Sequence, residues 1–117
     1  MISLIDLQKK IGYHETQKVD GDSICFDEQE AEIIVSIITC LKNYPIISAD
    51  DARIITRYDA VIKQVLVCLK KVSEASYHGE SEVMFFFNNL LPITKKILVC
   101  LGFEVLDVPI KRINIKW

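Results

Sequence analysis

The chain has 117 residues, half of them hydrophobic and 26% charged, with a formal net charge of −2 at pH 7. This length predicts a single domain over residues 1–117, and the apolar content excludes a disordered chain. No apolar run reaches the roughly 18–20 residues that span a bilayer, and the first residues lack the basic segment of a signal peptide. We therefore expect a cytoplasmic protein that does not associate with a membrane.

The charges are divided unevenly along the chain. Residues 1–52 carry ten acids and four bases, whereas residues 53–117 carry six acids and ten bases. Such polarity is typical of a surface that binds a protein or a nucleic acid. It also arises when acids lie at helix N-termini and bases at helix C-termini, where each complements the helix dipole, and this second interpretation is favoured.

The N-terminal segment predicts a short helix over Leu4–Ile11. Ser3 is a suitable N-cap, and Gly12 suits the left-handed position that ends a helix. Ile5 is expected to face inward. Residues 13–26 lose the helical period, and Asp20-Gly21 is typical of a two-residue hairpin turn, so this segment is predicted as a hairpin, with an irregular loop as the alternative.

Two longer helices follow. The first runs from Asp27 to about Asn43, since Asp27 and Glu30 form a capping box and apolar residues recur at helical spacing. The second is predicted as one continuous helix over Ala49–Val72, capped by Ser48 and ~36 Å long at 1.5 Å per residue.

A last helix is predicted from Glu80 or Ser81 to Leu101. Its apolar phase survives across Pro92, which favours one kinked helix over two helices with Pro92 in the first turn of the second. After Gly102, apolar and polar residues alternate as they do in strands, which predicts an antiparallel hairpin. The expected fold is α+β: a small bundle of three to four helices with a short antiparallel C-terminal hairpin, with the 13–26 segment as a candidate to pair with it.

The sequence carries no catalytic, metal or cofactor motif. The four cysteines, Cys25, Cys40, Cys68 and Cys100, form no CxxC pair and are expected to be free buried thiols. His78 has acidic neighbours, but an exposed polar residue is the more common role, and no nucleophile accompanies it. We therefore predict a non-enzymatic protein without a cofactor or a bound metal.

The run Met84-Phe85-Phe86-Phe87 predicts a protein interface, with burial beneath the C-terminal hairpin or the first helix as the equally weighted alternative. A helix cannot bury four consecutive large side chains on one face, so Met84 or Phe85 would point away from the core while Phe86 and Phe87 point inward. Met84 and Phe85 are the expected apolar anchors. The same patch would also serve to close a symmetric homodimer. An acidic patch is expected to add electrostatic attraction to a protein partner; its residues are Asp20, Asp22, Glu28 and Glu32.

A nucleic-acid site is the alternative hypothesis. Basic and aromatic residues gather near the C-terminus: Lys111, Arg112, Lys116 and Trp117. The negative net charge argues against this site, and Trp117 alternates in phase with the apolar Ile113 and Ile115. Nucleic acid is therefore the less favoured partner.

The end of the chain resembles a known class of proteins. A helix is followed by Leu101-Gly102-Phe103-Glu104-Val105 and then by Ile113-Asn114-Ile115-Lys116-Trp117. This ending is similar to the tails of small accessory proteins of tailed phages, and the likeness covers about the last 20 residues. It implies a small non-enzymatic protein that binds a host or phage component, in the host cytoplasm.

Overall fold

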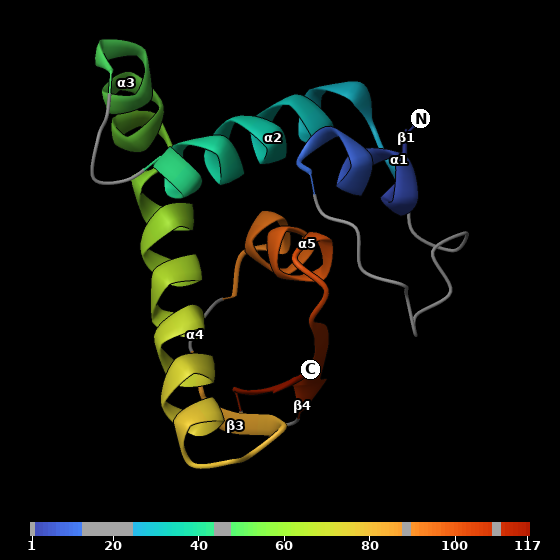
Figure 1. Ribbon diagram of the computed structural model, residues 1–117, viewed down its shortest axis with the longest axis vertical. Helices are drawn as coiled ribbons and strands as arrows, with labels where there is room; N and C mark the ends of the chain where they lie inside the picture. Colours follow the sequence, from blue (N-terminus) through green and yellow to red (C-terminus); the bar gives the residue numbers. More distant parts are fainter. Residues whose placement is uncertain (1, 13–24, 44–47, 88–89, 109–110) are drawn as a thin grey trace. The chain divides into compact units, whose positions relative to one another are not determined.

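The computed structural model describes residues 2–12, 25–43, 48–87, 90–108 and 111–117 (Figure 1). The described residues form helices and antiparallel sheets, so the α+β class is confirmed. The elements are β1 (Ile2–Ser3), α1 (Leu4–Lys10), β2 (Cys25–Phe26), α2 (Glu28–Asn43), α3 (Ala49–Arg57), α4 (Asp59–Tyr77), β3 (Glu82–Phe86), α5 (Pro92–Cys100), β4 (Glu104–Val108) and β5 (Arg112–Lys116).

The chain forms two compact units, Met1–Ile62 and Lys63–Trp117. Each unit is described by itself. A single domain over residues 1–117 stays a prediction.

The first unit begins as its capping signals predict. The Ser3 hydroxyl accepts a hydrogen bond from the Asp6 amide at 3.2 Å, and Gly12 ends the turn with φ +77°. Leu4 and Leu7 are fully buried, but Ile5 is 43% exposed, so its expected inward position is wrong. The reason is helical geometry, because positions 4 and 7 lie on the same face of the helix.

Only the end of the predicted 13–26 hairpin lies within the described residues. There, β2 pairs antiparallel with β1, with Ile2 opposite Phe26. Residues 13–24 lie outside the described part, so the Asp20-Gly21 turn stays a prediction. The helix α2 then starts with the predicted capping box, since the Asp27 carboxylate accepts from the Glu30 amide at 2.7 Å and Glu30 reaches back to the Asp27 amide at 3.4 Å.

The expected continuous helix over Ala49–Val72 is divided into α3 and α4. Ser48 and Asp51 form a second capping box at the start of α3. At Tyr58 the backbone leaves helical geometry, with φ −110° and ψ 30°. No Gly or Pro marks the break. Asp59 follows the break, four residues after Ile55 and three before Ile62, where a continuous amphipathic helix would carry an apolar residue. It becomes the first-turn acid of α4.

The kinked helix predicted over Ser81–Leu101 is wrong. Residues 82–86 form the strand β3, and α5 begins with Pro92 at its first position, as the alternative interpretation held. β3 pairs with β5, which lies about 30 residues later in the chain. The aromatic side chains of β3 suit a strand with one buried face. β5 supplies the backbone hydrogen-bond partners of β3, and the local pattern of residues 82–86 does not reveal a pairing with so distant a strand.

Gln64 of α4 holds the start of α5 in place. The N-cap residue Leu91 has no side-chain hydrogen bond to offer. The Gln64 side-chain oxygen instead accepts hydrogen bonds from the Leu91 amide at 3.0 Å and from the Thr94 hydroxyl at 2.8 Å. This contact satisfies the buried Thr94 hydroxyl and ties α5 to α4 within the second unit.

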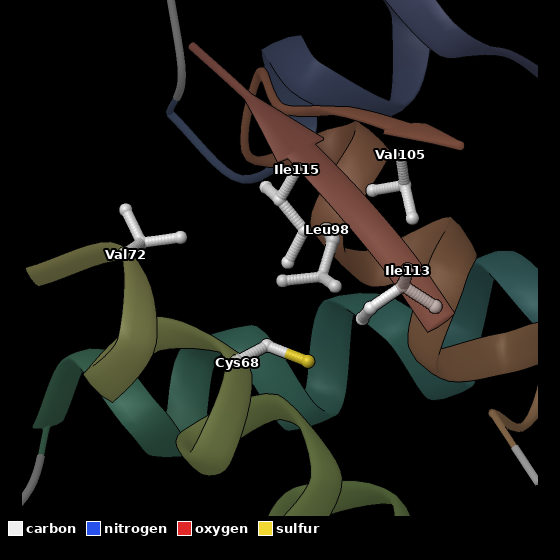
Figure 2. Packing of buried hydrophobic residues seen from close by; sticks show 6 residues of the cluster. All are labelled: Cys68, Val72, Leu98, Val105, Ile113 and Ile115. Carbon is white, nitrogen blue, oxygen red and sulfur yellow. The ribbon is translucent and has the colours of Figure 1, made fainter. Parts of the chain in front are cut away.

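The second unit is built on the three-stranded antiparallel sheet β3–β5–β4, with β5 in the centre. One face of this sheet packs against α4 and α5, and Figure 2 shows Ile113 and Ile115 of β5 close to Leu98 of α5. The cluster of buried residues comprises Cys68, Val72, Leu98, Val105, Ile113 and Ile115. The predicted C-terminal hairpin is confirmed as β4 and β5, and β3 completes the sheet.

Within the described residues, none of the helices combines the length and the apolar character needed to cross a membrane.

Candidate protein-interaction surface

The sheet of the second unit has a second face that does not join the core cluster. Successive side chains of a strand point to opposite faces, and the register places three rows across the sheet. We call this face the outer sheet face. Its rows are Glu82, Lys116 and Glu104; Met84, Asn114 and Leu106; and Phe86 and Arg112.

Three large apolar side chains of the outer sheet face are open to solvent. Met84 is 51% exposed, Phe86 is 66% exposed and Leu106 is 42% exposed. Met84 and Phe86 are two residues apart on β3, and Leu106 lies in the same row as Met84. The three therefore form a patch on one sheet rather than scattered single residues, and patches of this kind mark binding surfaces.

Asn114 lies in the middle of this patch, on the central strand between Met84 and Leu106. Its side-chain nitrogen donates to the Glu82 carboxylate at 3.5 Å. Its side-chain oxygen is buried and meets no donor among the described residues. A buried acceptor without a donor lowers the free energy of unfolding by about 1–3 kcal/mol, so the Asn114 side chain destabilises the single folded chain.

The two ends of the outer sheet face carry opposite charge. At one end, Glu82 and Glu104 flank Lys116, whose ammonium lies 3.9 Å from the Glu82 carboxylate. At the other end, the Arg112 guanidinium lies 4.5 Å from the centre of the Phe86 ring. This cation–π contact holds the cation over the exposed aromatic ring of the patch.

The structure places the two predicted anchors on opposite faces. Met84 is exposed as expected, but Phe85 is partly buried against the core cluster, and its ring meets that of Phe87 edge-to-face at 5.9 Å. Phe86, which the helical interpretation turned inward, is the exposed aromatic instead. An interpretation of Val83–Phe87 with the strand period of two would have found it.

The predicted acidic patch is described only in part. Asp20 and Asp22 lie outside the described residues. Glu28 and Glu32 are exposed on α2 in the first unit, where they line a surface hollow of about 660 Å³ together with Lys10. An interface role for these acids stays a prediction.

The basic C-terminal residues do not share one face. Arg112 and Lys116 belong to the outer sheet face, whereas Trp117 follows the opposite alternation and packs edge-to-face on Phe103, with ring centres 6.4 Å apart. Lys111 precedes β5 with φ 52°. The aromatic base-stacking partner assumed for a nucleic-acid site is therefore turned away from Arg112 and Lys116.

The cysteines Cys40, Cys68 and Cys100 are buried free thiols, as predicted for these three. Burial raises the pKa of Cys68 to about 11 and that of Cys100 to about 12. Burial, and then the hydrogen bond to Asp51 at 3.4 Å, raise the pKa of Cys40. Thiols kept protonated in this way are poor nucleophiles and serve as small apolar core residues.

Within the described ranges, no group of three or more His, Cys, Asp or Glu side chains is placed to hold a metal ion. His78 lies in the exposed turn after α4. Comparison of the chain with protein-family models, curated proteins and solved structures finds no match.

Proposed function

We propose that this protein is non-enzymatic and acts by binding another protein through the outer sheet face. The observation that carries the proposal is the joint exposure of Met84, Phe86 and Leu106 on one face of one sheet. Met and aromatic residues are enriched in the cores of protein interfaces. Burying these side chains against a partner would remove apolar surface from water at about 25 cal/mol per Å².

The surroundings of the patch also suit an interface. Charged residues border it at both ends, Glu82 and Glu104 at one and Arg112 at the other. A rim of this kind sets orientation and association rate more than affinity. The resemblance of the chain's end to small accessory proteins of tailed phages supports a host or phage component as the partner, encountered in the cytoplasm.

The proposal is tested with a tagged full-length chain and two matched variants. Phe86→Glu puts a charge at the Arg112 end of the patch, where Arg112 can pair with it, so the sheet is kept. Leu66→Glu is the control because Leu66 is similarly exposed, at 50%, but lies on α4. Both variants must retain the circular dichroism of the original chain.

We expect proteins that bind the original chain and the Leu66→Glu variant to be lost with Phe86→Glu by at least about tenfold, the usual cost of removing an interface anchor. Binding would be measured by quantitative mass spectrometry of captured proteins at low and moderate salt. A partner retained equally by both variants would contradict the surface assignment. Recovery of nucleic acid alone, lost at moderate salt, would favour the Arg112 and Lys116 alternative.

A further inference from the structure

We infer that the protein partner supplies an extended segment, which adds to the open edge of β3 as a fourth, antiparallel strand. The inference deepens the proposed function and rests on it. β3 is an edge strand, because the order of the sheet is β3–β5–β4. An edge strand presents a row of backbone donors and acceptors, and a strand of another protein can bind to that row.

Two backbone hydrogen bonds fix which residues of β3 face β5. The Trp117 amide donates to the Ser81 carbonyl at 3.0 Å, and the Phe87 amide donates to the Lys111 carbonyl at 2.8 Å. Each bond joins residues that lie directly opposite each other when the register of β3 and β5 is continued by one position. Hydrogen-bonded and non-bonded pairs alternate in an antiparallel ladder, so the odd-numbered residues of β3 bond to β5.

The even-numbered residues of β3 therefore direct their backbone groups to the open edge. Glu82, Met84 and Phe86 each point one N–H and one C=O away from β5. Within the part of the chain that the structure describes, these outward groups meet no hydrogen-bond partner. They repeat every ~7 Å, the spacing at which another extended chain presents its own backbone groups.

β3 lacks three features that commonly protect an edge strand. Its five residues pair one-to-one with β5, so no bulge twists the edge away. Its sequence, Glu82–Phe86, contains neither Pro nor Lys, and its single charge is at the first residue. β4, the other edge of the sheet, carries Asp107 inside the strand, and a charge there discourages pairing. Strand addition is therefore favoured at β3.

The core side of β3 is incompletely covered. Ile113 and Ile115 of β5 and Val105 of β4 are buried. Val83 and Phe85 of β3 are only partly buried against the same cluster. An added strand with apolar residues beside Val83 and Phe85 would remove their remaining surface from water, which favours binding.

The outer side chains define the segment that fits this edge. An antiparallel strand places one residue opposite each of Glu82, Met84 and Phe86, with its side chain on the outer sheet face. A basic residue suits the position opposite Glu82. An acidic residue opposite Phe86 can pair with Arg112, which lies over the Phe86 ring. The segment therefore reads acidic, three apolar residues, basic. The β3 strand of a second copy would place Phe86 instead of a base opposite Glu82, so it fits less well.

The experiment uses the full chain and a fluorescent probe peptide, acetyl-Thr-Glu-Val-Ile-Val-Arg-Thr-amide. Its Glu is designed to lie opposite Phe86 and its Arg opposite Glu82. We expect fluorescence polarisation to give a dissociation constant between about 10 µM and about 1 mM. A control peptide carries N-methyl groups on Glu, Ile and Arg, whose amides would face β3. It should bind at least about tenfold more weakly, because each methyl group removes a donor. A probe that does not bind, or that binds as well when methylated, would overturn the inference.

Amide hydrogen exchange measured by nuclear magnetic resonance locates the bound probe. In the chain alone, the outward amides of Met84 and Phe86 should exchange faster than those of Val83 and Phe85. Saturating probe should slow exchange of the outward amides at least about tenfold. Outward amides that are equally protected before the probe is added, or that the probe leaves unchanged, would overturn the inference. Protection that appears without probe, as the chain is raised from about 20 to about 500 µM, would assign the edge to a second copy and also overturn it.

A matched pair of variants separates the backbone of β3 from its side chain. Met84→Pro and Met84→Ala both remove the Met side chain, but only Pro removes the outward N–H. An edge strand accepts Pro where its N–H would face solvent. We expect Met84→Pro to weaken probe binding at least about tenfold and Met84→Ala by less than about threefold. If Met84→Pro does not retain the circular dichroism of the original chain, the methylated peptide makes the same test from the other strand.

The outcomes separate this inference from the proposed function. Equal losses with Met84→Pro and Met84→Ala would assign binding to the side chain, which overturns strand addition and supports the outer sheet face. Capture of a protein that depends on Phe86, by a chain that does not bind the probe, would have the same meaning. Absence of both the Phe86-dependent protein and probe binding would reject the two proposals together.

Discussion

Phe85 and Phe86 are neighbours in the sequence and face opposite environments in the structure. Phe85 packs on the core cluster of the second unit, and Phe86 is 66% exposed beneath the Arg112 guanidinium. The pleat of β3 causes this difference, because consecutive side chains of a strand point to opposite faces. The helical interpretation reversed the two roles.

Alanine substitutions distinguish the two environments. Phe85→Ala removes packing from the core face, and we expect it to lower the free energy of unfolding by about 2–3 kcal/mol, somewhat less than for a fully buried Phe. Phe86→Ala removes only an exposed ring and its cation–π contact, so its cost should stay below about 1 kcal/mol. Urea unfolding followed by circular dichroism measures both values. The opposite order would indicate that residues 82–86 are helical.

At the scale of elements, the starts of α1, α2 and α3 follow from local capping residues. Ser3, Asp27 and Ser48 each accept from the amide three residues ahead. These are contacts within one turn, so the sequence contains everything needed to predict them. The start of α5 differs, because Gln64 of another helix supplies the missing acceptor.

Pro92 provides a test of the element boundaries. At the first position of α5, Pro has no hydrogen bond to lose and a favourable φ, so Pro92→Ala should change the free energy of unfolding by less than about 1 kcal/mol. Inside a continuous helix, the same substitution would restore a backbone hydrogen bond and remove a clash, a gain of about 3 kcal/mol. Thermal and urea unfolding of the full chain would show such a gain and would thereby contradict the strand-turn-helix order.

At the scale of the whole molecule, the chain presents two compact units and the sequence predicts one domain. Trp117, the only tryptophan, belongs to the second unit, whereas helices occur in both units. Tryptophan fluorescence therefore reports on one unit and far-ultraviolet circular dichroism reports on both.

We expect the two signals to give the same urea midpoint and the same slope, because a single domain of this size unfolds in one cooperative transition. A fluorescence transition at a different midpoint from the dichroism transition would contradict the single domain and make the units separate domains. Repeating the measurement at two protein concentrations would separate this effect from dimer dissociation, which shifts the midpoint with concentration.

The sequence by itself determined the features that depend on near neighbours. The capping boxes at Asp27 and Ser48, the end of α1 at Gly12 and the alternation of β5 were all predicted correctly, because each rests on residues within a few positions of one another. The same holds for the α+β class and for the burial of Cys40, Cys68 and Cys100.

Only the tertiary structure decided what residues 82–86 become. Their run of Met and Phe suits a helix face or a strand, and the choice depends on β5, which reaches β3 from about 30 residues away. Pairing with that strand turns Phe85 inward and Phe86 outward, and it brings Met84 into one row with Asn114 and Leu106. The candidate surface therefore exists only once the sheet has formed, because it needs β3 beside β5, a pairing that the sequence does not predict.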